Sequence, residues 1–165
     1  MNSNFKWIDN GGVTSAKGYK ACGVAAGIKA NRTDMAMLLS DRASTCAGLF
    51  TSNLVAAAPV VLDRERAATG KCRGVVVNAG CANACTGSKG FTDAVEMARM
   101  AAEAVGIAEN EMLVSSTGTI GRRLPMQRVA EGIKLAKDAL SHDGGAAAAR
   151  AIMTTDTVPK EVALK

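Results

Sequence analysis

The chain has 165 residues and a mass of 16.9 kDa, which suits one domain with an apolar core. Hydrophobic residues make up 48% and charged residues 21%, so the composition excludes extensive disorder. The net charge is +5, but Lys and Arg are scattered and no base-stacking aromatic residues accompany them. We therefore expect a globular protein that does not bind nucleic acid.

No apolar run reaches the roughly 20 residues that a membrane span requires. At the N-terminus, Lys6 is not followed by the apolar stretch of a signal peptide. The five cysteines form an odd set at irregular spacing, which favours reduced thiols. These features predict a cytoplasmic protein without a membrane partner.

The first half of the chain contains short apolar runs. Residues 35–39 and 46–51 are predicted as two strands, and residues 40–44 as the turn that joins them. Residues 59–62 are predicted as the end of a strand that leads into a short helix over 63–68. Residues 74–77 are Gly-Val-Val-Val, which is typical of a strand buried on both faces.

The second half alternates helices with one further strand. A helix is predicted after Gly90-Phe91, capped by Thr92 and ended by Gly106. Residues 112–115 are predicted as a buried strand, and Pro125 opens the next helix. Residues 146–152 are predicted as a last helix, followed by an apolar, strand-like run over 162–164. This alternation favours layered α/β architecture.

Several familiar kinds of site are missing from the sequence. His142 is the only histidine, and its neighbours Ser141 and Asp143 are adjacent in sequence, which is not how a catalytic triad is built. Cys81 and Cys85 have no second ligand pair, so we interpret them as small core residues and expect no metal site.

Two Gly-rich segments follow the two predicted buried strands. The first, residues 78–87, reads Asn-Ala-Gly-Cys-Ala-Asn-Ala-Cys-Thr-Gly, and spacing alone favours an ordinary Gly/Asn turn there. The second, residues 115–121, reads Ser-Ser-Thr-Gly-Thr-Ile-Gly. Ligands of α/β proteins gather beyond the carboxyl ends of strands, where small residues allow N–H groups to reach a developing oxyanion. A Gly-rich connection to the next helix explains the second segment equally well.

Together with residues 152–157 (Ile-Met-Thr-Thr-Asp-Thr), these segments closely resemble the ornithine acetyltransferase family. Members carry N-x-G-x-A-N-A-x-T-G, S-T-G-x-I-G and M-T-T-D in this order. Earlier stretches are also similar to the family, among them Gly-Val-Ala-Ala-Gly-Ile-Lys at 23–29 and Gly-Leu-Phe-Thr at 48–51. The resemblance extends over essentially the whole chain.

The resemblance implies an α-β-β-α sandwich built from a precursor that cleaves itself at an Ala–Thr bond. The new N-terminal Thr of the β chain is the nucleophile. The family transfers an acetyl group from N-acetylornithine to glutamate in arginine biosynthesis, and bifunctional members also use acetyl-CoA. Two α and two β chains form the usual heterotetramer. No Ala-Thr-Met-Leu segment is present, so residues 1–165 are expected to be a single domain, most of the α chain, without the nucleophile.

The same resemblance assigns the candidate site residues. Thr117 and Gly118 match the oxyanion hole, and Thr154 or Thr155 matches the substrate-contacting threonine. Asn78 and Asn83 are expected to shape the active-site wall. No cofactor is implied.

Two other functions fit parts of the sequence. One is a related self-cleaving aminopeptidase or amidase, whose donor would be a peptide. The other is a small-molecule-binding domain that uses the loop at Gly118. The joint presence of the three motifs favours the acetyltransferase.

Overall fold

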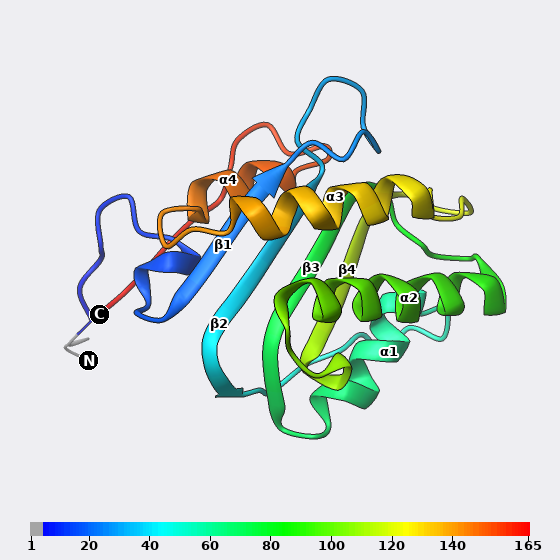
Figure 1. The fold of residues 1–165 in the computed structure, drawn as a ribbon, viewed down its shortest axis with the longest axis horizontal. Helices are drawn as coiled ribbons and strands as arrows, with labels where there is room; N and C mark the ends of the chain where they lie inside the picture. Colours follow the sequence, from blue (N-terminus) through cyan, green and yellow to red (C-terminus); the bar gives the residue numbers. More distant parts are fainter. Residues whose placement is uncertain (1–4) are drawn as a thin grey trace.

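In the computed structural model, which describes residues 5–165, the chain forms a four-stranded mixed sheet packed with helices (Figure 1). The order is β1 (Tyr19–Val24), β2 (Met35–Thr45), β3 (Lys71–Cys81) and β4 (Met112–Thr119). The first three strands are antiparallel neighbours, whereas β3 and β4 are parallel. The predicted α/β class is confirmed.

The two faces of the sheet are covered unequally. The long helices α2 (Gly87–Val105) and α3 (Met126–Ala139) cross one face, and α1 (Ala58–Ala67) lies beside β4 (Figure 1). The short helix α4 (Gly145–Ala151) packs over β1 and β2 on the other face. Of the four layers expected for the sandwich, the described residues thus form one sheet and its helix layer. The second face remains largely open over β3 and β4.

Small and flexible side chains fill the main core, as the low aromatic content requires. Met35, Met37 and Met112 project from the sheet and are fully buried. Opposite them, α2 contributes Met97 and a row of buried alanines (Ala94, Ala98, Ala101 and Ala102). Alanines allow the helix to approach the sheet closely, and methionines adapt to the remaining irregular gaps.

The other face has a much smaller core. Ala21, Ala36, Ala148 and Ala151 are buried together where α4 meets β1 and β2. A Cβ atom on Gly23 would overlap the carbonyl oxygen of Ala147, so glycine allows the α4 backbone to lie directly on the strand. This close packing fixes the start of the segment that carries Thr154 and Thr155.

The predicted turn at residues 40–44 is wrong. The chain continues there as β2, with an irregularity between Leu39 and Ser44. The guanidinium of Arg73 donates to the carbonyl oxygens of Ser40 and Asp41, and the Ser40 and Ser44 hydroxyls are hydrogen-bonded to each other. These contacts hold a turn-like sequence in a strand. The strand predicted over 46–51 is also wrong, since that segment has no regular structure.

Two helices begin earlier than predicted. Residues 59–62, predicted as a strand end, are the first turns of α1, where Pro59 occupies a position that suits proline. Helix α2 begins at Gly87 rather than after Phe91, and Thr92 does not cap it. Its predicted end is confirmed, because Gly106 is left-handed with φ 69°. The strands predicted over 74–77 and 112–115 are confirmed within the longer β3 and β4, as are the helices after Pro125 and over 146–152.

The two ends of the described chain lie together. Trp7 and Leu164 form an isolated antiparallel bridge, flanked by hydrogen bonds between Lys6 and Lys165. The apolar run at 162–164 therefore makes one bridge rather than a strand. Trp7 and Leu164 nonetheless remain exposed.

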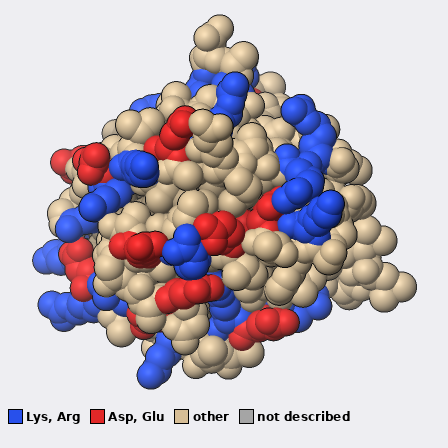
Figure 2. Space-filling model, turned by 45° about the vertical axis from the view of Figure 1, so that its right-hand side comes forward, with Lys and Arg blue, Asp and Glu red and all other residues tan. Residues whose placement is uncertain are grey.

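The surface carries both signs of charge close together. On the face drawn in Figure 2, Lys and Arg side chains alternate with Asp and Glu. An example is Arg99 on α2, which pairs with Glu96 and Glu103. Within residues 5–165, no helix combines the length and apolar character that crossing a bilayer demands.

Asp63 connects α1 to the edge strand and generates a pH prediction. Its carboxylate accepts the Val114 N–H at 3.0 Å, and burial raises its pKa from 3.8 to about 6. The carboxyl group of Asp63 therefore binds its proton more tightly in the folded chain than in the unfolded chain. As pH rises from about 4 to about 6, the contribution of Asp63 to the free energy of unfolding should fall, by about 1–2 kcal/mol after allowance for partial exposure.

Urea unfolding at several pH values measures this slope. Asp63→Asn should remove the fall, and the matched control Asp138→Asn, on the exposed side of α3, should keep it. Identical pH slopes for wild type and Asp63→Asn would contradict the assignment.

Candidate active site

The carboxyl ends of β3 and β4 meet at two glycines. Gly80 is paired with Gly118 in the parallel ladder, and both have positive φ, 110° and 132°. A Cβ atom on Gly118 would overlap the carbonyl carbon of Gly80 and lie 2.6 Å from the Cys81 nitrogen. Only glycine fits such backbone contact in this conformation. The Gly118 predicted from the sequence therefore occupies a position that the fold itself restricts.

Thr117 opens onto a cavity on the less covered face of the sheet. The cavity has a volume of about 640 Å³ and is lined by Thr117 and Ser115 from β4, together with Val75 and Val77 from β3. Helix α4 and residues 160–162 form its other side. Gly118 directly follows Thr117, so a backbone N–H comes one residue after a hydroxyl that lines this cavity. Such a pair can stabilise the oxyanion of a tetrahedral intermediate.

Thr154 and Thr155 follow α4 near the same cavity. Ile152, two residues before Thr154, is a lining residue. Thr154 is half-buried and donates its N–H to Asp156 at 3.3 Å, while Thr155 is exposed. Asp156 also pairs with Lys160, whose hydrogen bond lowers the pKa of that carboxyl. Ile152 and Lys160, on either side of this segment, line the cavity of Thr117, whereas Thr154 and Thr155 do not.

Asn78 is fully buried and connects the two strands that carry the glycines. Its amide nitrogen donates to the Cys81 carbonyl at 2.8 Å, and its amide oxygen accepts the Ser116 hydroxyl at 2.6 Å. Both polar ends of the amide are satisfied, as a buried side chain requires. Asn78 therefore holds Ser116 and the turn at Gly80 from inside the protein.

Asn83 also fixes the backbone with both ends of its amide, in the loop between β3 and α2. It is fully buried with φ 47°, donates to the Gly90 carbonyl at 2.8 Å and accepts the Thr86 hydroxyl at 2.8 Å. These bonds join the loop after β3 to the first turn of α2. Neither asparagine lines the cavity of Thr117, and their contribution to the active-site wall stays a prediction.

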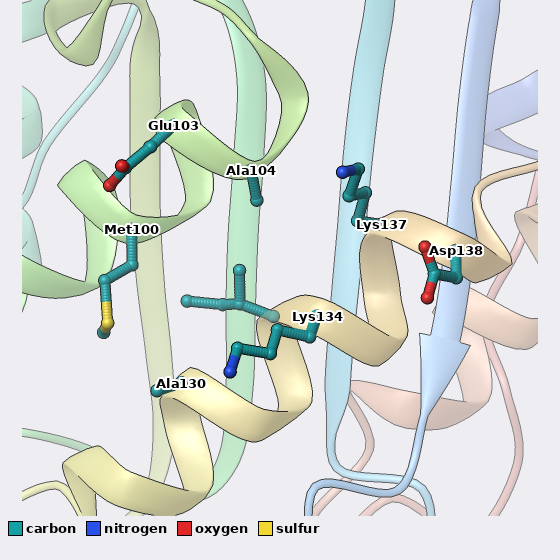
Figure 3. Close-up of a pocket in the computed structure, with 8 residues that line it drawn as sticks. Met100, Glu103, Ala104, Ala130, Lys134, Lys137 and Asp138 are labelled. Carbon is teal, nitrogen blue, oxygen red and sulfur yellow. The ribbon is translucent and has the colours of Figure 1, made fainter.

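A second hollow lies on the opposite, helix-covered side of the sheet. It has a volume of about 530 Å³ between α2 and α3. Figure 3 shows Lys134, Lys137 and Asp138 on α3, with Met100 and Glu103 on α2. None of the predicted site residues lines this hollow. It mixes acids and bases on an exposed surface, without the strand ends that Thr117 and Gly118 provide.

Other residues considered from the sequence lie elsewhere. His142 is exposed, and its Nδ1 lies 3.0 Å from the Tyr19 carbonyl, in agreement with a loop position. Cys81 is buried as predicted, but Cys85 is exposed, so its interpretation as a core residue is wrong. The exposure follows from its left-handed turn, at φ 57°, between Asn83 and α2.

Sequence patterns did not single out Asp34 and Lys29, which lie behind the glycine pair. Asp34 is fully buried and accepts the N–H groups of Ala26 and Lys29 at 2.6 and 2.7 Å. Lys29 reaches the end of α4, where its ammonium donates to the Met153 carbonyl at 2.7 Å. No local pattern reveals a contact between residues more than 120 positions apart.

Known proteins of one family are similar to this chain. Residues 20–165 match the model of the ArgJ family. The chain belongs to the ArgJ family. Among curated relatives of this family, the Arginine biosynthesis bifunctional protein ArgJ of Symbiobacterium thermophilum is 55% identical over 163 residues. That of Caldanaerobacter subterraneus is 50% identical over 158 residues. These alignments cover 97% and 96% of the chain but 40% and 39% of the relatives, so the chain spans about 40% of their length.

Solved ArgJ structures share the whole fold. The Arginine biosynthesis bifunctional protein ArgJ of Bacillus halodurans has a TM-score of 0.92 at 38% identity, covering 99% of this chain and 86% of that chain. The Ornithine Acetyltransferase of Mycobacterium tuberculosis, complexed with ornithine, has a TM-score of 0.93 at 41% identity. That alignment covers 98% of this chain and 88% of the other. The layered fold implied by the resemblance is thus confirmed as that of the ArgJ family.

Proposed function

We propose that this chain is the α portion of an acetyltransferase of arginine biosynthesis. The reaction moves the acetyl group of N-acetylornithine to the α-amine of glutamate. The nucleophile is an N-terminal Thr on a β chain from the same precursor, and two copies of each chain form the working assembly. Membership of the ArgJ family supports this proposal, as does the Mycobacterium tuberculosis relative, which is an ornithine acetyltransferase complexed with ornithine.

The lengths of the relatives support a division into two chains. The chain spans about 40% of the curated relatives but 86% and 88% of the two solved chains. The solved chains are therefore much shorter than the curated relatives. Cleavage of a precursor into an α chain and a longer β chain accounts for this difference.

Acetyl transfer proceeds in two balanced steps. The Thr hydroxyl attacks the acetyl carbonyl, the C–N bond breaks, and ornithine leaves with the proton as its amine. The glutamate amine then attacks the acetyl-Thr ester, the C–O bond breaks, and the proton returns to the Thr oxygen. Each step passes through a tetrahedral oxyanion. The amine of the N-terminal Thr can serve as the base. Because this base, the nucleophile and the oxyanion donors are all protein groups, the proposed mechanism needs no metal or cofactor.

The observation that carries the proposal is the Thr117–Gly118 pair. The close approach to Gly80 fixes Gly118, and the preceding Thr117 lines the cavity. In the proposed mechanism, the Thr117 hydroxyl and the Gly118 N–H donate to the oxyanion. Donors held in place by the backbone stabilise this charge without reorganisation during the reaction.

The open face of the sheet supports a β-chain partner. Leu38, Val75 and Val77 project from it and are only half-buried. An α-β-β-α sandwich covers such a face with a second sheet. In this assembly the nucleophilic Thr enters the cavity from the β chain, opposite Thr117. Acetyl-CoA is a second acetyl donor in this proposal, in keeping with the relatives described as bifunctional.

The full-length protein that contains this chain provides the direct test. After cleavage into two chains, incubation with labelled N-acetylornithine and glutamate should yield labelled N-acetylglutamate. A folded, cleaved protein that leaves the acetyl group on ornithine would overturn the proposal. Release of amino acids from peptides by the same protein would favour the aminopeptidase or amidase instead.

Thr117 and Ser115 form a matched pair, because both hydroxyls come from β4 and line the same cavity. Thr117→Ala should lower kcat for acetyl transfer by about 10²–10³-fold, the usual effect of losing one oxyanion donor. Ser115→Ala should change kcat by less than about three-fold, since it is not adjacent to Gly118. Equal kcat values for the two variants would remove Thr117 from the oxyanion hole.

A further inference from the structure

Lys29 spans the space between the glycine pair and the end of α4. It lies in the loop between β1 and β2, and its ammonium donates to the carbonyl oxygens of Met153, at 2.7 Å, and Ala151, at 3.4 Å. Carbonyl groups at a helix C-terminus lack partners within the helix and carry partial negative charge. A lysine ammonium satisfies both needs. Its contact at Met153 directly precedes Thr154.

The backbone of Lys29 is fixed by hydrogen bonds, as its ammonium group is. The Lys29 N–H donates to Asp34, whose carboxylate is fully buried and also binds the Ala26 N–H. The Asp34 carbonyl accepts the N–H of Ala79 at 2.7 Å. Ala79 directly precedes Gly80. The loop that carries Lys29 is therefore tied to the end of β3.

The apolar stem of Lys29 packs against Gly80. A Cβ atom on Gly80 would lie 2.9 Å from the Lys29 Cγ, so the stem occupies the space that any other residue would need there. Gly80 in turn contacts Gly118. The Lys29 side chain thus contacts Gly80, which packs against Gly118 at the end of β4, and it also bonds to the segment before Thr154.

The partners of its ammonium distinguish Lys29 from Lys20, which is also half-buried. Lys20, on β1, pairs with the Asp41 carboxylate at 3.4 Å, and surface ion pairs of this kind contribute little. The Lys29 ammonium instead binds two carbonyl groups. Burial lowers the pKa of its amine most strongly, Asp34 opposes this, and Arg32 lowers it further.

We propose that Lys29 is a positioning residue that couples the end of β4 at Gly118 to the substrate-binding segment at Thr154 and Thr155. The proposal rests on the proposed acetyl transfer. The ammonium fixes the 153–155 backbone, and the stem supports Gly80 and, through it, Gly118. Two of the three ammonium donors are directed at the Ala151 and Met153 carbonyls, so the role that we assign to Lys29 is one of positioning.

Two variants separate the effect of the Lys29 ammonium group from that of the aliphatic part of the side chain. Lys29→Met keeps an unbranched apolar stem but removes the ammonium. It should raise KM for N-acetylornithine and glutamate by about ten-fold, with kcat within about two-fold of wild type. Lys29→Ala removes the stem as well, so kcat should also fall, by about ten-fold. Lys20→Met is the matched control and should leave both constants unchanged.

Hydrogen exchange provides a readout independent of catalysis. The amides of Ile152 and Met153 bond within the last turn after α4. In the full-length, cleaved protein, Lys29→Met should speed the exchange of these two amides by about ten-fold. The reason is that the turn loses the hydrogen bonds that the Lys29 ammonium donates to its carbonyl groups. Lys20→Met should not speed this exchange.

The outcomes separate this proposal from the function on which it rests. Unchanged KM in Lys29→Met, with or without faster exchange, would overturn the role of Lys29 while leaving acetyl transfer intact. A fall in kcat alone would do the same. Absence of acetyl transfer in the wild-type protein would overturn the proposed function, and with it the substrate part of the Lys29 proposal.

Discussion

The contact between Gly80 and Gly118 is the constraint on which the candidate site depends. At the carboxyl ends of these parallel strands, a Cβ atom on Gly118 would overlap the Gly80 backbone, and one on Gly80 would meet Lys29 and Ile28. This contact fixes the backbone of Gly118, which directly follows Thr117 on the wall of the cavity. Backbone groups positioned in this way are rigid, which is the property that oxyanion stabilisation requires.

Buried polar side chains maintain this contact from behind. Asp34, Asn78 and Asn83 are fully buried. The two asparagines bond to backbone and hydroxyl groups around the turn after β3 or on β4, and the Asp34 carboxylate accepts two N–H groups of the loop between β1 and β2. An unsatisfied group at any of these positions would cost about 1–3 kcal/mol. Their hydrogen bonds define a single arrangement of loops in a core whose small alanine and flexible methionine side chains specify little shape by themselves.

Much of the fold was predictable because its signals are local. The stop at Gly106 identified the end of α2, the Val-rich run identified β3, and a short apolar run identified β4. The turn predicted at residues 40–44 failed because Arg73, some thirty residues away, bonds to its carbonyls. For the site, spacing indicated only Gly-rich loops after strands. The roles of Thr117 and Gly118 came from family resemblance, and Lys29 became visible only through contacts across the fold.

The open sheet face and the length of the relatives lead to one central claim, that this chain supplies the oxyanion hole to a nucleophile on a second chain. A structure of the cleaved protein, incubated with N-acetylornithine without glutamate to accumulate the acetyl-enzyme, tests it most directly. The claim predicts an acetyl carbonyl oxygen within about 3 Å of both the Thr117 hydroxyl and the Gly118 nitrogen. An acetyl group attached elsewhere, or a carbonyl oxygen directed away from this pair, would contradict the claim.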